Sequence, residues 1–136
     1  MKRSLLSLVL AFMLVVAFGS VSLADNVSPG IPPTLKLEVT QSPLAVYPPI
    51  MIYTATLSPI PIDTSRQIII DFYNAKYDPA GIVAPEFEYI GSAVLDPTTG
   101  QAKLAKSMYP GVYVAYCMTK SLGEPIYSEK VIYKVQ

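Results

Sequence analysis

The chain has 136 residues, of which 51% are hydrophobic, and ten basic side chains balance ten acidic ones. It holds one cysteine, no histidine and no tryptophan, which excludes the usual zinc sites, Ser-His-Asp and Cys-His catalysis, and a disulfide framework. The balanced charge offers no electrostatic footprint for nucleic acid, so we expect no nucleic-acid partner.

The first 24 residues have the pattern of an export signal. Two basic residues at positions 2 and 3 precede an apolar run, Leu5 to Phe18, and the segment ends in Ser22-Leu23-Ala24. This order predicts a signal peptide over residues 1–24, cleaved before Asp25. The alternative is a retained anchor, because the stretch to Ala24 is just long enough to span a membrane. We expect a secreted or cell-envelope protein (periplasmic in a Gram-negative cell), with no stable membrane insertion after cleavage.

The rest of the chain has the pattern of a small all-β domain. All 13 prolines follow position 24, at intervals that exclude a long helix. Residues 25–33 form a Pro-rich lead-in that carries a glycosylation sequon at Asn26, and residues 34–136 form the folded domain. β-branched and aromatic runs alternate with Pro- and Gly-containing turns. They predict seven strands, at about residues 34–40, 50–57, 67–74, 87–95, 101–107, 111–119 and 127–135.

Period-two alternation assigns the faces of these strands. On the second strand Met51, Tyr53, Ala55 and Leu57 share the expected inward face, opposite Ile52. On the other strands the expected inward residues are Ile68, Ile70, Phe72, Ala102, Leu104, Val131, Tyr133 and Val135. Together these sets predict the core of a β-sandwich.

Five segments carry a resemblance to a known family. They are Met51–Leu57, Ile70-Asp71-Phe72-Tyr73, Ile90-Gly91-Ser92-Ala93-Val94-Leu95-Asp96, Gly100-Gln101-Ala102-Lys103-Leu104 and Pro110-Gly111-Val112-Tyr113-Val114-Ala115-Tyr116. In this order they resemble the bacterial Ig-like domain repeats of secreted and cell-surface proteins, over about residues 34–135. The resemblance implies an immunoglobulin-like Greek-key β-sandwich, a spacer or adhesion role, and no catalytic residues. The chain departs from the family in being a single unit and in having a longer insert, Asn74–Glu86.

Two residues of the sixth strand have expected structural roles. Tyr113 follows Pro110-Gly111, where such sandwiches often place a tyrosine corner whose hydroxyl binds the backbone. Cys117 shares the inward face with Ala115, so we expect a buried small hydrophobe rather than a reactive thiol.

The acidic residues give no convincing site of chemistry. Glu86 and Glu88 share a strand face, which could suggest the carboxylate pair of a glycosidase. Nothing in the sequence supplies a cleft or a partner acid for such a pair, so we expect two solvated charges at a sheet edge. Asp96, Thr98 and Gln101 offer too few carboxylates for calcium, and their segment is more simply a hairpin turn. We therefore expect no enzyme, no catalytic residues, no metal and no cofactor.

The sixth strand is apolar on both faces, which points to a partner. Its outer row joins outward residues of the third and seventh strands in an expected apolar strip of Ile69, Tyr73, Val114, Tyr116, Met118 and Ile132. An exposed strip of this kind marks a partner surface. We expect an exported module that acts by protein–protein contact, in an adhesion-type role or by self-association. The alternative is a small-ligand or carbohydrate-binding module that uses Pro-rich loops and exposed tyrosines.

Overall fold

The computed structural model describes residues 31–61 and 66–136. The segment Pro33–Gln136 forms one compact unit of eight strands. They are β1 (Thr34–Gln41), β2 (Ile50–Ser58), β3 (Ile69–Lys76), β4 (Glu88–Val94), β5 (Gln101–Ser107), β6 (Gly111–Thr119), β7 (Ile126–Tyr127) and β8 (Val131–Val135). The described ranges hold no helix that could cross a membrane. The expected signal peptide over 1–24 and most of the lead-in over 25–33, with Asn26, lie outside the described residues.

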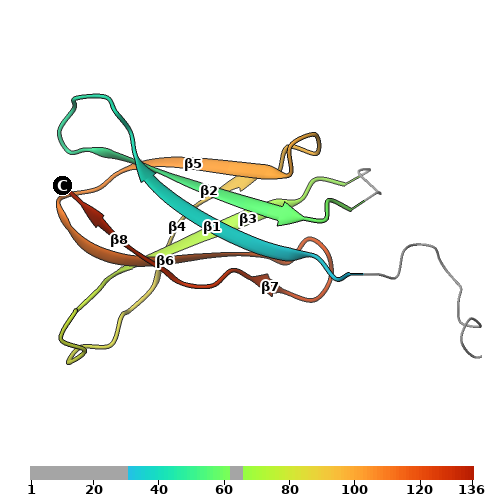
Figure 1. Cartoon of the computed structure of the whole chain (residues 1–136). Coiled ribbons are helices and arrows are strands. Elements are labelled where there is room, and N and C mark those ends of the chain that lie inside the picture. Colours follow the sequence, from blue (N-terminus) through green and yellow to red (C-terminus); the bar gives the residue numbers. More distant parts are fainter. Residues whose placement is uncertain (1–30, 62–65) are drawn as a thin grey trace, which may run out of the picture. The chain divides into compact units, whose positions relative to one another are not determined.

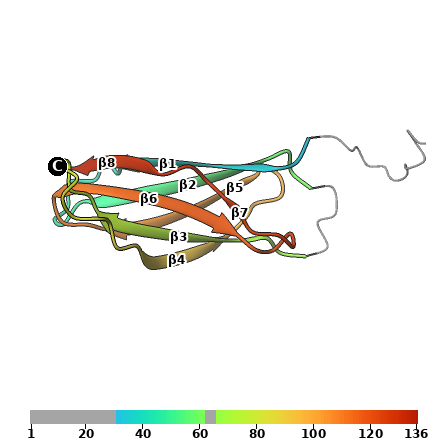
Figure 2. The same cartoon turned by 90° about the horizontal axis from the view of Figure 1, so that it is seen from below.

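The strands form two antiparallel sheets, which confirms the all-β prediction. One sheet has the order β1-β2-β5, and the other has the order β4-β3-β6-β7, with β8 also paired to β6. Every pair of neighbouring strands is antiparallel. Figures 1 and 2 show the two layers from perpendicular directions. This arrangement is compatible with a β-sandwich.

The core lies between the two sheets and follows the period-two pattern. The four expected inward residues of β2 are all buried, with exposed fractions of at most 2%. Opposite them, Ile70 and Phe72 of β3 and Cys117 of β6 are fully buried. Leu35 and Leu37 from β1 and Val135 from β8 complete the apolar cluster. The core therefore draws on strands from both sheets, which holds the sheets together.

Two strands differ by more than one residue from their expected bounds, and the third begins at Ile69 rather than at residue 67. β3 continues past Asn74 to Lys76 because β6 pairs with it as far as Lys76 opposite Tyr113. The expected last strand is split at Ser128 into β7 and β8. There the Ser128 hydroxyl accepts a hydrogen bond from the Cys117 N–H at 2.9 Å. A side chain thus takes the place of a backbone acceptor, and the strand is interrupted.

A bulge shapes the edge strand β4. Phe72 pairs with Gly91 but Tyr73 pairs with Tyr89, so Ile90 is the extra residue on β4. Gly91 has a φ of +147°, and a Cβ there would meet the Leu104 side chain of β5 at 3.1 Å. Glycine therefore allows β4 to lie close against the opposite sheet.

Tyr113 and Cys117 occupy buried positions on β6. The Tyr113 hydroxyl donates a hydrogen bond to the Tyr109 carbonyl at 2.8 Å, which is the contact of a tyrosine corner. The Cys117 side chain is fully buried. Burial raises the pKa of its thiol to about 11, against a smaller lowering by the hydrogen bond with Ser128. The thiol is therefore protonated at neutral pH.

Candidate functional site

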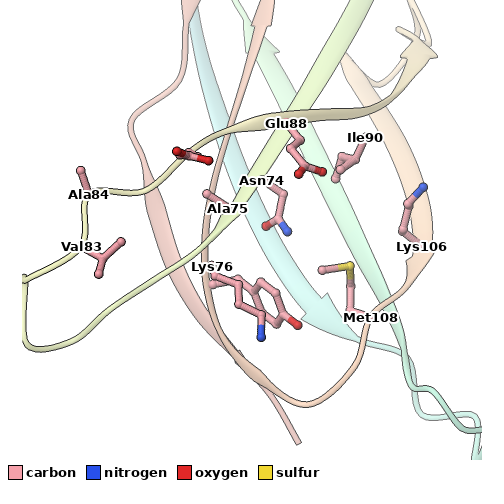
Figure 3. A pocket seen from close by; sticks show the side chains of 11 residues that line it. Asn74, Ala75, Lys76, Val83, Ala84, Glu88, Ile90, Lys106 and Met108 are labelled. Carbon is pink, nitrogen blue, oxygen red and sulfur yellow. The ribbon is translucent and has the colours of Figure 1, made fainter.

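A cavity of about 570 Å³ opens beside β3, at the end of the sandwich where the insert between β3 and β4 projects. Its size is within the range of small-molecule sites. Figure 3 shows the lining side chains. They are Asn74, Ala75, Lys76, Val83, Ala84, Glu86, Glu88, Ile90, Lys106, Met108 and Tyr113. We call this cavity the Asn74 pocket.

Three local features assemble the Asn74 pocket. The last part of β3 places Asn74 opposite Glu88 of β4 and adds Ala75 and Lys76 to the lining. The bulge in β4 places its extra residue, Ile90, in the lining. The other sheet contributes Lys106, near the end of β5, so the lining draws on both layers.

Asn74 is a buried polar residue of the pocket lining. Its side chain is only 6% exposed, and its Oδ1 accepts a hydrogen bond from the Tyr133 hydroxyl at 2.6 Å. The Tyr133 hydroxyl in turn lies 2.5 Å from the Tyr53 hydroxyl. Since Tyr133 donates to Asn74, Tyr53 must donate to Tyr133. We call this chain of side chains, Tyr53 to Tyr133 to Asn74, the polar relay.

The polar relay fixes which end of the Asn74 amide can bind a ligand. Across residues 31–61 and 66–136, no buried side-chain nitrogen or oxygen lacks a hydrogen-bond partner. The Oδ1 atom of Asn74 is bound to Tyr133, which leaves the amide N–H₂ group as the part of this side chain that can bind a ligand in the cavity that Asn74 lines. Two donors are thereby offered at the floor of the pocket.

Burial has a clear effect on the two tyrosines of the polar relay. Desolvation raises the pKa of Tyr53 above its ordinary value, although the hydrogen bond with Tyr133 lowers it. Desolvation also raises the pKa of Tyr133, and its contact with Tyr53 raises it further. Both hydroxyls are therefore neutral at physiological pH, and the relay carries hydrogen bonds without charge.

The wall formed by the insert is held in shape by Asp78. Its carboxylate accepts hydrogen bonds from the backbone N–H groups of Ala80, Ile82 and Val83, each at 3.0 Å. The bonds with Val83 and Ala80 are the main causes that lower the pKa of Asp78. Val83 itself lines the pocket, so Asp78 shapes the wall without lining it.

This arrangement predicts a loss of order in the insert in acid. A carboxyl whose pKa is lowered in the folded protein stabilises above its unfolded pKa, about 3.9, and this contribution is lost as the pH falls through the folded value. We expect amide exchange protection of Ala80, Ile82 and Val83 to fall between about pH 5 and about pH 2. Hydrogen exchange followed by NMR measures it. Asp78→Asn should show low protection at both pH values, and equal protection in the two proteins would contradict the prediction.

The expected apolar strip is only partly at the surface. Ile69 and Ile132 are exposed, at 42% and 55%, whereas Val114 and Met118 are buried, at 3% and 4%. β6 is a central strand, so its outward side chains are flanked on both sides: Val114 by Ala75 and Ile132, and Met118 by Asp71 and Tyr127. The expectation of exposure at Val114 and Met118 is therefore wrong, and the strip is interrupted.

The two tyrosines of the strip lie in a cluster of aromatic rings. Tyr73 and Tyr116 are stacked, with ring centroids 5.0 Å apart and planes 12° apart. The edge of Phe87 packs on Tyr116, also at 5.0 Å, and the Lys130 ammonium lies over the Phe87 ring. Desolvation and the nearby Tyr73 raise the pKa of Tyr116. Because Tyr73 and Tyr116 stack face to face, the faces in contact are not available to a ligand, and the pair forms no open stacking platform.

The acidic residues considered as candidate sites lie in two different places in the structure. Glu86 and Glu88 are exposed, and Glu88 lies on the edge strand β4, which confirms the expectation of solvated charges at an edge; both also line the Asn74 pocket. Asp96 accepts a hydrogen bond from the Thr98 N–H at 2.8 Å, within a turn that an isolated Asp96–Gln101 bridge closes. The described part of the chain contains no group of three His, Cys, Asp or Glu side chains that could hold a metal ion.

Comparison with known proteins gives no family for this chain. No family model matches it, and no curated protein matches it. Among solved structures it is similar to the Pseudomonas fluorescens alkylpurine DNA glycosylase AlkC bound to DNA containing an abasic site analog. The identity is 15% and the TM-score 0.41, over 75% of this chain and 30% of that chain. A likeness of this size transfers no activity, substrate or site.

Two expectations made from the sequence are not carried further. The similar structure is that of a protein bound to DNA, which conflicts with an adhesion-type or self-associating module and with the absence of a nucleic-acid partner. Neither expectation is retained. For the alternative of a small-ligand or carbohydrate module on Pro-rich loops and exposed tyrosines, the stacked pair Tyr73 and Tyr116 offers no open platform, whereas Tyr47, Tyr89, Tyr109 and Tyr127 are exposed.

Proposed function

We propose that this chain is a binding protein that takes a small polar molecule in the Asn74 pocket. The observation that carries the proposal is the buried Asn74 amide, whose oxygen is occupied by Tyr133 and whose N–H₂ group is left to bind a ligand in the cavity. Amide donors at the floor of a cavity can bind a ligand that accepts hydrogen bonds. The site therefore uses β3, β4 and the insert, rather than Pro-rich loops or a tyrosine face.

We propose that the pocket binds its ligand without converting it. Its lining has no serine, cysteine or histidine, and its one hydroxyl, that of Tyr113, is hydrogen-bonded to the Tyr109 carbonyl. The lining therefore offers no serine or cysteine nucleophile with a histidine base.

We also propose an immunoglobulin-like Greek-key topology related to the bacterial Ig-like domains. In the immunoglobulin fold the first, second and fifth strands share one sheet, and the third, sixth and last strands share the other. The orders β1-β2-β5 and β4-β3-β6-β7, with β8 on β6, support this assignment. β4 lies beside β3 rather than beside β5, and that position builds one side of the pocket.

For location, we propose export by the segment 1–24 as a signal peptide, with the mature chain secreted or kept in the cell envelope. The basic start, the apolar run and the small residues before Asp25 support it.

An NMR titration with four small probes of different charge tests the binding function. The probes are myo-inositol, succinate, ethanolamine and the dipeptide leucyl-glycine, each at millimolar concentration. We expect at least one of them to shift the amide signals of Ala75, Lys76, Val83 and Glu88. Asn74→Asp keeps the oxygen that Tyr133 needs and removes the donors, so the affinity for a probe that accepts hydrogen bonds from Asn74 should fall about tenfold.

A second pair of variants tests whether a loss of the shifts reflects lost binding in the pocket or a change in folding. Ala84 lines the pocket and Ala80 does not, although both are exposed residues of the same insert. Ala84→Trp should abolish the shifts, and Ala80→Trp should leave them. If no probe shifts the pocket amides, or if the shifts persist in both Asn74→Asp and Ala84→Trp, the proposed function is wrong.

A further inference from the structure

The Asn74 pocket has charges of both signs in its lining. Lys76 and Lys106 supply two ammonium groups, and Glu86 and Glu88 supply two carboxylates. In Figure 3 the Glu88 side chain lies just above the Asn74 amide, Lys106 lies farther to its right, and Lys76 lies below it. A lining of one sign would select an ion of the opposite sign. This lining instead complements a ligand that itself carries both charges.

The pocket also has an apolar side. Val83 and Met108 are in the lining, together with Ile90 of the bulge. Figure 3 shows Met108 close below Asn74, with Val83 across the cavity on the insert. Tyr113, whose side chain is only 5% exposed, also lines the pocket with its ring. An apolar group of the ligand can therefore be removed from water beside the charged groups.

We infer that the ligand is a zwitterion with an apolar side chain, namely a free amino acid or a short peptide. Its carboxylate accepts hydrogen bonds from the Asn74 amide and pairs with Lys76 and Lys106. Its α-ammonium group pairs with Glu86 and Glu88, and its side chain packs on Met108 and Ile90. This inference rests on the proposed function, and it names the class of ligand for the same pocket.

The geometry of the floor gives the carboxylate its position. An amide N–H₂ group donates hydrogen bonds and accepts none, so of the two charged ends it can bind only the carboxylate. The polar relay holds the Asn74 oxygen against Tyr133, so the amide is not free to turn its acceptor toward the ligand. A ligand with a cation alone would leave the Asn74 donors unsatisfied.

Four forms of one peptide test the inference. Leucyl-glycine carries both charges, N-acetyl-leucyl-glycine only the anion, leucyl-glycinamide only the cation, and N-acetyl-leucyl-glycinamide neither. We expect leucyl-glycine to bind at least about tenfold more tightly than either singly charged form, as measured by NMR titration or calorimetry, since charge-assisted hydrogen bonds are the stronger ones. Free leucine in parallel distinguishes an amino acid from a peptide as the preferred source of this chemistry.

Charge-neutral variants show which residues recognise each end. Lys106→Met should weaken leucyl-glycine and N-acetyl-leucyl-glycine but leave leucyl-glycinamide unchanged. Glu88→Gln should weaken leucyl-glycine and leucyl-glycinamide but leave N-acetyl-leucyl-glycine unchanged. Lys103→Met is the matched control, because Lys103 is an exposed lysine of β5 outside the lining. Equal affinity for the charged and capped peptides would overturn the inference. If myo-inositol shifts the pocket amides and leucyl-glycine does not, the inference fails while the proposed function stands. If no probe binds, both fail.

Discussion

Replacing Phe72 with alanine is expected to lower the free energy of unfolding by about 3–5 kcal/mol. The Phe72 side chain is fully buried, and its ring centroid is 6.2 Å from that of Tyr53 in the opposite sheet. β3 is hydrogen-bonded to β4 on one side and to β6 on the other. The backbone is therefore poorly placed to close the cavity left by the ring. Urea denaturation measures the loss as a lower midpoint at an unchanged slope.

Val94→Ala is the control for this variant. Val94 lies on the neighbouring strand and is 51% exposed, so its truncation should change the free energy of unfolding by no more than about 0.5 kcal/mol. A loss below about 1 kcal/mol for Phe72→Ala would contradict the assignment of Phe72 to the centre of the core.

Tyr133→Phe is expected to lower the free energy of unfolding by about 2–4 kcal/mol, although it removes a single oxygen. The change leaves the Tyr53 hydroxyl and the Asn74 Oδ1 without their partners in the polar relay. Both groups are buried, so each incurs a desolvation cost with no hydrogen bond to offset it. Thermal and urea denaturation of the purified chain measure the effect.

A double-mutant cycle separates the polar relay from simple loss of packing. Tyr53→Phe alone should cost less than Tyr133→Phe, because Tyr133 can still donate to Asn74. In the Tyr133→Phe background, Tyr53→Phe should recover part of the loss by removing an unpaired hydroxyl. Strictly additive effects would show that the two hydroxyls do not act together. Tyr127→Phe, at an exposed tyrosine, should have little effect.

The core could be predicted from the sequence because it depends on local alternation. Met51, Tyr53, Ala55 and Leu57 need only period two to share a face, and the structure buries all four. The exposure of Val114 and Met118 could not be predicted from alternation in the same way. It depends on which strands flank β6, and strand neighbours far apart in the sequence are set by the tertiary fold.

The Asn74 pocket was missed for a related reason. Asn and Lys favour turns over strands, so the third strand was expected to end at residue 74, but pairing with β6 carries it to Lys76. One signal was present in the sequence. Asn74 continues the inward row of Ile70 and Phe72, and a polar residue on a buried face requires a partner. The lysine of β5 that completes the lining could not have been found without the structure.

The polar relay also fixes the alignment of the two sheets. Apolar inner faces repeat every two residues, so one sheet could slide along the other and still bury aliphatic groups. Tyr53 belongs to β2 and Tyr133 to β8, and their hydroxyls meet at 2.5 Å. A slide of one pleat would separate the two hydroxyls and leave both in the core without a hydrogen-bond partner. One pair of oxygen atoms thus favours a single alignment of the layers, and with it the placing of Lys106 across from Asn74.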